Sequence, residues 1–244
     1  MPLGMHSHDA GGQGLPPAFV RTLFDQYAER YDFELTQTLA YRAPEALRDL
    51  WVRVVTLRHA ARRASARRVH SHVMPVGVRS HDAPRGGLDV LDLGCGTGLS
   101  GQAFRAFAST LVGVDLSPRM VEKARARGIY DRVVVGDMTA VLGETPASFD
   151  LVLAVDALGY VGDLVPVFRA VHGALHPGGR FAATVEENAG EDFALGPARR
   201  FRHSAAYVRR TAEAAGFELL ALERTELRRD RGRPVAGLAF VLHA

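Results

Sequence analysis

The sequence predicts an α/β fold in which one doubly wound, mostly parallel sheet carries helices on both faces. Three observations lead to this prediction. An apolar stretch at residues 88–93 is followed at once by glycines at alternate positions. Beyond it, short apolar runs alternate with segments of helical periodicity up to residue 215. The chain then ends in two strand-like stretches, residues 217–227 and 235–242, joined by a turn.

The part of the chain before the glycines predicts two helices. Residues 1–14 are predicted to be a disordered tail. A proline pair at residues 16–17 opens the first helix, whose apolar side carries two tyrosines. A second helix is expected from Ala43 past Trp51. We expect residues 15–52 to pack over a ligand site as a lid and not to form an independent domain.

Residues 53–86 form an arginine-rich insert that contains eight arginines, four histidines and one acid, Asp82. Two interpretations are open. The insert could hold an anionic partner such as nucleic acid. Alternatively, it is a solvated extension of the preceding helix followed by a loop. No aromatic residues are interleaved with the arginines for base stacking, which favours the second interpretation.

Residues 88–98 are the most informative stretch of the sequence. The apolar run has the length and composition of a buried strand. Gly94, Gly96 and Gly98 follow, and their lack of a side chain lets the backbone of a tight turn approach a ligand closely. A helix is predicted next, up to Phe107. Strand, glycine loop and helix in this order bind an adenosine-containing cofactor outside the carboxyl end of the strand.

Two further strands end in acidic residues that indicate which cofactor binds. The next strand ends in Asp115, whose carboxylate can accept hydrogen bonds from both hydroxyls of a ribose. The third leads to Asp137 and Met138, which can hold the edge and the face of an adenine. Nicotinamide enzymes share part of this pattern, and residues 96–101 match G-x-G-x-x-G. Together with Asp92 and the final pair of strands, the pattern favours S-adenosylmethionine.

The remaining elements complete the doubly wound pattern. Periodicity predicts helices near residues 118–127, 163–175 and 204–215, and strands near 149–155 and 180–185. The turn of about six residues at 228–234 allows only an antiparallel return between the last two strands. The sheet is therefore expected to close with an antiparallel hairpin.

Five segments resemble, in order and spacing, the motifs of the class I S-adenosylmethionine-dependent methyltransferases. They are Asp-Leu-Gly-Cys-Gly-Thr-Gly (92–98), Val-Asp-Leu-Ser-Pro (114–118), Gly-Asp-Met (136–138), Phe-Asp-Leu-Val-Leu (149–153) and Leu-His-Pro-Gly-Gly (175–179). The resemblance covers residues 15–52 and 87–244. It implies a Rossmann-like sheet of seven strands with a C-terminal antiparallel hairpin and an N-terminal helical lid. A single methyltransferase domain is expected over residues 15–244, with residues 87–244 as its α/β core.

Residues 24–32 and 39–44 narrow the resemblance to the bacterial TPR-repeat methyltransferases, which are relatives of the biotin- and ubiquinone-pathway methyltransferases. The sequence shows no such repeats, so we expect no partner binding through them. The arginine-rich insert also stands where the family has a short linker. The family implies a small-molecule methyl acceptor.

The resemblance also implies which residues contact S-adenosylmethionine. These residues are Tyr27, Tyr31, Arg42, Asp92, Gly94, Cys95, Gly96, Asp115, Leu116, Met120, Asp137, Met138, Ala154 and Val155. The glycine loop faces the methionine end, Asp92 orders that loop, and the tyrosines cap the site. Alternatives remain open for three of them. Tyr27 and Tyr31 could be half-buried core residues, and Arg42 could form a surface ion pair instead of pairing with the cofactor carboxylate.

Candidate catalytic residues are His203 and Tyr160. A general base is needed only when the nucleophile arrives protonated. His203 could act as that base, or it could cap the helix that begins near Ser204. Tyr160 could line the acceptor pocket or pack under the lid. Glu186 and Glu187 could steer a cationic acceptor or face solvent.

Composition sets further bounds. The single cysteine excludes an internal disulfide framework, and no apolar run approaches the about 18 residues of a membrane-spanning helix, so a cytoplasmic protein is expected. No metal site is indicated. We expect methyl transfer to a small molecule by in-line displacement. The alternatives are RNA or protein methylation through residues 53–86, and a non-catalytic S-adenosylmethionine-binding assembly factor.

Overall fold

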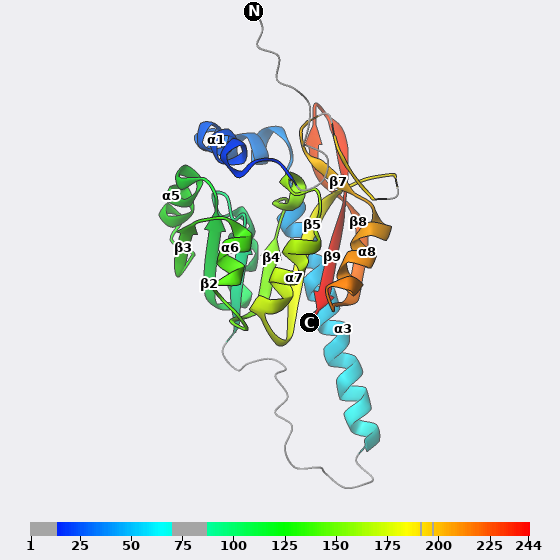
Figure 1. The fold of residues 1–244 in the computed structure, drawn as a ribbon. Coiled ribbons are helices and arrows are strands. Elements are labelled where there is room, and N and C mark those ends of the chain that lie inside the picture. Colours follow the sequence, from blue (N-terminus) through cyan, green and yellow to red (C-terminus); the bar gives the residue numbers. More distant parts are fainter. Residues whose placement is uncertain (1–13, 70–86, 191, 197) are drawn as a thin grey trace, which may run out of the picture.

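The structure, a computed structural model, describes residues 14–69, 87–190, 192–196 and 198–244. One mixed sheet of nine strands runs through the described residues (Figure 1). Its parallel part has the order β3 (Arg132–Val135), β2 (Ala108–Asp115), β1 (Leu88–Leu93), β4 (Phe149–Ala154) and β5 (Leu175–Glu187). The predicted doubly wound α/β fold is confirmed.

The predicted C-terminal hairpin is present, with a tighter turn than expected. β9 (Arg233–His243) lies antiparallel between β5 and β8 (Glu218–Asp230). The strands leave a turn of two residues, Arg231 and Gly232, whose φ angles are +49° and +75°. A two-residue hairpin turn of type I′ requires these left-handed conformations.

Two short strands extend the sheet beyond the seven that the sequence predicted. β6 (Phe193–Leu195) and β7 (Phe201–His203) form an antiparallel pair. β7 also pairs in parallel with the last two residues of β5, beyond the part of β5 that pairs with β4. Three residues are too few to show a period of two in a sequence, so pattern analysis missed both strands.

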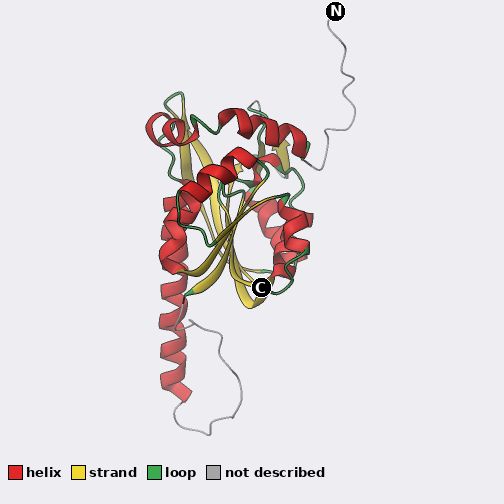
Figure 2. Cartoon of the chain, turned by 90° about the vertical axis from the view of Figure 1, so that its left-hand side faces the viewer, coloured by secondary structure: helices red, strands yellow, loops and turns green. Residues whose placement is uncertain are grey.

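Helices cover both faces of the sheet (Figure 2). α6 (Met138–Gly143), α7 (Val165–Ala174) and α8 (Ala205–Ala214) pack on one face. α3 (Ala43–Val69) and α4 (Leu99–Phe104) pack on the other, and α5 (Pro118–Ala126) lies against β2 and β3. The 3₁₀ turns η2 (Arg105–Phe107) and η3 (Leu158–Tyr160) follow α4 and β4. The helices predicted near residues 118–127, 163–175 and 204–215 are confirmed to within two residues at each end.

α3 belongs to the core of the protein, not to a lid. Leu47, Leu50 and Trp51 are at most 2% exposed and pack against the sheet. The first turns of the arginine-rich insert continue this helix, and Arg53 and Arg58 form ion pairs with acids of β8. The assignment of residues 43–52 to the lid is therefore corrected. The apolar face of α3 packs on β5, β8 and β9, which are distant in sequence, so its own sequence does not reveal this role.

The N-terminal segment, residues 14–38, lies over the carboxyl ends of the parallel strands (Figure 1). It contains α1 (Pro17–Tyr27), α2 (Tyr31–Phe33) and the π-helical turn η1 (Glu34–Thr38). Ser117 Oγ, at the start of α5, donates to Asp25 over 2.6 Å. Gly14 forms an isolated antiparallel bridge with Val161. The segment is thus attached to the α/β core at its start and near its middle.

Residues 1–13 and 70–86 lie outside the described residues, and with them most of the predicted tail and the second half of the predicted insert. In the part of the chain that the structure describes, no helix combines the length and the apolar character needed to cross a bilayer.

Candidate active site

A cavity of about 940 Å³ lies between the N-terminal segment and the carboxyl ends of the strands. Of the residues that the sequence indicated, those that line it are Tyr31, Gly94, Gly96, Asp115, Leu116, Asp137, Met138, Val155 and Tyr160. Further lining residues include Leu15, Val20, Phe24, Asp156, Val161 and Asp163. The residues of the N-terminal segment gave no sequence signal beyond apolar periodicity, because only tertiary packing turns that face toward the strand ends.

The glycine loop after β1 forms one wall of the cavity. Gly94, Gly96 and Gly98 have φ angles of +63°, +53° and +99°, which residues with a side chain rarely adopt. A Cβ at Gly94 would lie 2.6 Å from that of Ala157. The loop therefore requires glycine both for its backbone conformation and for its close contact with the segment after β4.

Asp115 lies at the end of β2 and borders the cavity. Its two carboxylate oxygens accept from the backbone N–H of Gly96 over 2.9 Å and of Ser117 over 2.8 Å. Burial raises the pKa of Asp115, and these two hydrogen bonds act in the opposite direction. The carboxylate thus connects the glycine loop to the start of α5.

Asp137 and Met138 reach the cavity from the end of β3. Asp137 is the N-cap of α6, and its Oδ1 accepts from the backbone N–H of Thr139 over 2.9 Å and of Ala140 over 3.2 Å. The cap fixes the carboxylate at the rim, with Met138 beside it. A helix cap was not among the roles that the sequence suggested for Asp137.

Four of the indicated residues lie behind the cavity wall instead of lining it. Asp92 is fully buried, and its Oδ2 accepts from Ser100 Oγ over 2.6 Å and from Tyr130 OH over 2.7 Å. Cys95, Met120 and Ala154 are at most 3% exposed. These four side chains therefore do not reach the cavity, because apolar core atoms or the glycine loop itself surround them.

Tyr27, predicted to cap the site, and Arg42, predicted to pair with the cofactor carboxylate, lie elsewhere. Tyr27 OH donates to the Glu34 carboxylate, and the Tyr27 ring packs edge-to-face on Tyr31 with centroids 5.8 Å apart. Arg42 is exposed beside a second, polar hollow formed by α3 and β8, where its backbone N–H donates to Leu227. Neither lines the cavity. Arg42 is remote from it because the chain turns away after η1 to enter α3.

His203 does not reach the cavity. Its imidazole is fully buried, stacks on Tyr207, and lies with Nε2 2.9 Å from the carbonyl oxygen of Gly162. Burial lowers the pKa of His203, which keeps the ring neutral. Ser204, not His203, caps α8 by accepting from Tyr207 N–H. Both sequence interpretations of His203 are corrected, because β7 turns the side chain into the core.

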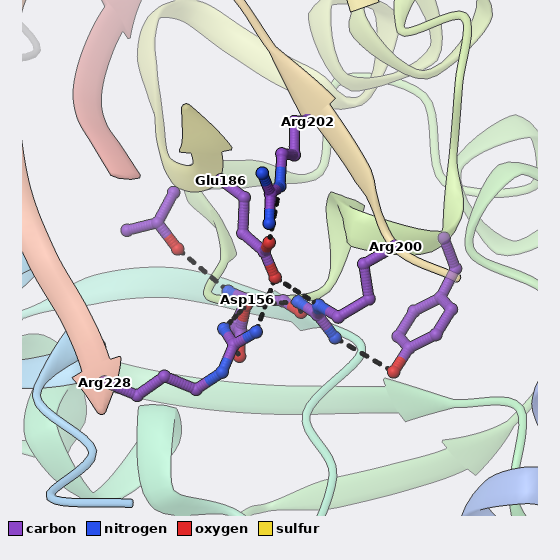
Figure 3. Close-up of polar contacts among 7 residues, drawn as sticks. Asp156, Glu186, Arg200, Arg202 and Arg228 are labelled. Carbon is purple, nitrogen blue, oxygen red and sulfur yellow. Dashed lines mark hydrogen bonds and ion pairs between the residues drawn. The ribbon is translucent and has the colours of Figure 1, made fainter. Parts of the chain in front are cut away.

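Behind the loop that follows β4 lies a group of charged residues, here called the buried charge cluster (Figure 3). Its buried members are Asp156, Glu186, Arg200 and Arg228, and the exposed Arg202 reaches it through Glu186. Arg200 Nε and Arg228 Nη2 each lie 2.5 Å from Glu186 Oε1. Although burial alone acts to raise it, the pKa of Glu186 is held below its usual value by Arg200 and Arg228. Glu186 therefore neither faces solvent nor is free for a cationic acceptor.

The cluster ends at the cavity. Asp156 lines the cavity, adopts a φ of +57° and binds both Arg200 and Arg228. Tyr160 also lines it, and the Tyr160 hydroxyl accepts from Arg200 Nη1 over 2.9 Å. Sequence analysis missed Arg200 and Arg228, since an arginine in an arginine-rich chain gives no signal and their partners are far apart in sequence. Within the described residues, no group of three or more His, Cys, Asp or Glu side chains could hold a metal ion.

Comparison with known proteins agrees with this geometry. A family profile described as "Methyltransferase domain" matches residues 91–183. A ubiquinone biosynthesis O-methyltransferase from Ralstonia nicotianae is 30% identical over 175 residues, which cover 66% of this chain and 74% of that protein. A crystal structure of an S-adenosylmethionine-dependent methyltransferase from Mesorhizobium loti is 26% identical, with a TM-score of 0.50 over 66% of this chain and 94% of that one.

A third relative matches almost the whole fold. It is the 1,6-didemethyltoxoflavin-N1-methyltransferase of Burkholderia thailandensis, whose structure contains 1,6-didemethyltoxoflavin and S-adenosylhomocysteine. The TM-score is 0.63 over 98% of this chain and 97% of that one, at 18% identity, which shows likeness of fold alone.

The fold and the cavity define an α/β protein that binds an adenosine-containing cofactor at the carboxyl ends of a doubly wound sheet. The chain belongs to the class I S-adenosylmethionine-dependent methyltransferases. S-adenosylmethionine is its cofactor, and the alternative of a nicotinamide dinucleotide is set aside.

Proposed function

We propose that the protein transfers the methyl group of S-adenosylmethionine to an oxygen atom of a small molecule. The observation that carries this proposal is that one continuous cavity, covered by the N-terminal segment, extends from the glycine loop to Tyr160. Its volume of about 940 Å³ is at the upper end of the range for small-molecule sites, about 300–1,000 Å³, so it has room for more than one small ligand.

The cofactor fits the wall that carries the glycine loop. Gly94 and Gly96 have no side chain, so their backbone can lie close to the methionine end of the cofactor. Asp115 would take the ribose, and Leu116, Asp137 and Met138 would surround the adenine. When bound, the cofactor supplies a methyl carbon that is already activated on a sulfonium, so the chain has to position it and exclude water.

The acceptor would occupy the other end of the cavity. Leu15, Phe24 and Val161 line it together with Tyr160 and two acids, Asp156 and Asp163. Phe24 and Tyr160 pack edge-to-face with centroids 5.3 Å apart, so the N-terminal segment closes this end directly. We infer that residues 15–38 act as a lid that admits the acceptor and then excludes water.

Oxygen is favoured as the methylated atom by the relative from Ralstonia nicotianae, which is named an O-methyltransferase. Methylation of RNA or protein is less well supported. α3, which begins the arginine-rich insert, runs away from the cavity toward the opposite end of the molecule (Figures 1 and 2). A macromolecule held along α3 would not reach the cavity.

The test combines binding and turnover. Calorimetry with the full chain should show micromolar binding of S-adenosylhomocysteine and none of NAD. Asp115→Ala should weaken this binding by about 1.5–3 kcal/mol, the scale for losing hydrogen bonds to a charged group. Glu122→Ala, which removes an exposed carboxylate from the neighbouring α5, is the matched control.

Turnover is then measured as release of S-adenosylhomocysteine with a panel of small phenols, carboxylic acids and alcohols. Methylation of any of them supports the proposal. Binding of the cofactor without turnover of any small molecule would instead favour a non-catalytic binding module. Methylation of RNA or protein alone would overturn the small-molecule assignment.

A further inference from the structure

The ionisable side chains of Asp, Glu, Lys, Arg and His type that line the cavity are all acidic. Asp115, Asp137, Asp156 and Asp163 border it, and among the described residues no lysine, arginine or histidine does. The chain contains 30 lysines and arginines and 10 histidines, so composition alone does not explain this. Which ligand suits such a cavity depends on how many of the four carboxylates are already neutralised.

Three of the four carboxylates are engaged elsewhere in the site. Asp115 connects the glycine loop to α5 and would take the ribose, and Asp137 caps α6 beside the place proposed for the adenine. Asp156 forms ion pairs with Arg200 and Arg228. The buried part of the charge cluster holds two arginines and two carboxylates, so it brings no net charge to the cavity wall.

Asp163 is the carboxylate that differs. Its Oδ1 accepts from Tyr207 OH over 2.9 Å and from the backbone N–H of Val165 over 3.0 Å. Both donors are neutral, and no lysine, arginine or histidine of the described chain forms an ion pair with Asp163. Its Oδ2 accepts no hydrogen bond from these residues and is not a buried atom. The second oxygen is therefore open to a ligand.

Tyr207 fixes the direction of this carboxylate. The tyrosine is 8% exposed on α8, and its hydroxyl accepts from the backbone N–H of Leu164 over 2.9 Å. The hydroxyl proton is thus directed to Asp163 Oδ1. Because α7 and α8 both hold Oδ1, the carboxylate presents Oδ2 in a constant position.

We propose that Asp163 binds a protonated amine of the methyl acceptor. The acceptor class is therefore a small hydroxyl compound that also carries an ammonium group. This inference rests on the proposed function and deepens it, because it names the substrate class of the same cavity. It is carried by a carboxylate that borders the cavity, has one open oxygen and has no cationic partner.

An ammonium group suits this position better than a neutral donor does. The cavity wall near Asp163 in sequence is apolar, with Val161, Pro166 and Val167. A negative charge beside apolar atoms is best compensated by a full positive charge, and hydrogen bonds between two charged groups are the stronger ones. The rings of Phe24 and Tyr31 line the same cavity, and the faces of aromatic rings attract cations.

Binding as a cation also agrees with methylation at oxygen. A protonated amine has no lone pair on nitrogen. While Asp163 holds it in this form, the nitrogen is not a nucleophile, and the hydroxyl oxygen is the atom left to react.

The test uses two series of phenols in which only the charge of one substituent changes. The first is tyramine, tyrosol and 4-hydroxyphenylacetate, and the second is 3-hydroxybenzylamine, 3-hydroxybenzyl alcohol and 3-hydroxybenzoate. Calorimetry is done with the full chain saturated with S-adenosylhomocysteine, at about pH 7, where alkylamines are protonated. In at least one series the amine should bind about tenfold or more tighter than the alcohol, the scale for a hydrogen bond between charged groups, and the carboxylate should bind weakest.

Asp163→Asn localises the effect. The amide oxygen of asparagine can still accept from Tyr207 OH and Val165 N–H, whereas an NH₂ group replaces the open Oδ2. The preference for amine over alcohol should fall to about onefold. Glu122→Gln removes the same charge from the exposed side of α5 and should keep the preference. Binding of S-adenosylhomocysteine by Asp163→Asn verifies that the variant is folded.

Four results would overturn the inference: no amine binds, an alcohol binds as tightly as its amine in both series, a carboxylate binds tightest, or folded Asp163→Asn keeps the preference. If Asp163→Asn does not fold, the order of binding to the wild type decides. These outcomes are separate from failure of the proposed function. Turnover of neutral hydroxyl compounds by a protein without preference for amines would retain the methyltransferase assignment and reject the cationic acceptor.

Discussion

At the scale of single residues, the site depends on polar side chains that neighbours from distant parts of the chain hold in place. Asp115 connects the glycine loop to α5 through two backbone N–H groups. Arg200, Glu186 and Asp156 come from three separate segments, and Arg200 forms ion pairs with both acids (Figure 3). Each of these carboxylates is fully engaged, so removing one partner leaves a buried group without compensation, which is costly.

Asp92 makes the stability of the protein depend on pH. Burial raises its pKa from 3.8 to about 6. Because the folded state holds the proton more tightly than the unfolded state, the free energy of unfolding contributed by Asp92 falls as the pH rises from about 4 to about 6, by about 3 kcal/mol. Relative to the wild type, Asp92→Asn should therefore gain about this amount over that range in denaturant titrations. Parallel stability curves for the two proteins would contradict this prediction.

At the scale of elements, α3 and the N-terminal segment differ in how they are held. α3 buries an apolar stripe against the sheet, with Leu47 and Leu50 at 0% and 2% exposure. The N-terminal segment is attached through polar contacts, among them Asp25 with Ser117 and Asp32 with Thr97 and Arg127. Elements held by few buried apolar contacts open at lower free energy than the core does. α3 is therefore a fixed structural element, whereas the N-terminal segment is attached in the way expected of a segment that can move.

The role of α3 is tested by two of its leucines, of which one is buried and one is exposed. Leu50→Ala should lower the free energy of unfolding by about 2–5 kcal/mol, the usual result of emptying a packed site. Leu57, which is 69% exposed, provides the control, because Leu57→Ala should change stability by less than about 0.5 kcal/mol. If both variants were equally mild, α3 would not be part of the core.

We expect the N-terminal segment to become more ordered when the cofactor binds, because Phe24 and Tyr31 gain contacts with a ligand in the cavity. Hydrogen exchange should show residues 19–31 gaining protection with S-adenosylhomocysteine. Asp32→Ala should reduce this gain. Glu29→Ala, whose exposed pair with Lys123 contributes little, should leave it unchanged. Equal protection with and without ligand would make the segment a fixed part of the core.

At the scale of the whole molecule, the two unusual parts of the chain lie at opposite ends. The cavity and the N-terminal segment lie at the carboxyl ends of the parallel strands, whereas α3 extends beyond the other end of the sheet (Figure 1). Events along the far part of α3 are therefore remote from the proposed chemistry, unless a partner reaches around the protein.

This separation predicts the result of shortening the insert. Removing residues 64–85 should change the binding of S-adenosylhomocysteine by less than about 0.6 kcal/mol, since a change in loop length has a small entropic effect. The thermal midpoint should stay close to that of the full chain. If the shortened protein instead lost a salt-sensitive affinity for RNA, the nucleic-acid interpretation of the insert would be favoured.

The sequence by itself determined the elements whose residues carry a local physical constraint. Gly94 and Gly96 require positive φ angles, and the apolar runs at β1 and β4 can only be buried strands in this context. Asp115 and Met138 follow their strands directly, so the shared direction of parallel strands was enough to bring them to one cavity. The fold, the cofactor and this wall of the site were therefore predictable.

Only the tertiary structure decided which way a side chain points when its environment comes from distant segments. His203 and Ser204 are adjacent in sequence, yet the first turns into the core and the second caps α8. Arg200 and Arg228 are two arginines among many until β5, β8 and the loop before β7 bring them to Glu186. Burial and pairing are long-range properties, and no local pattern in one sequence contains them.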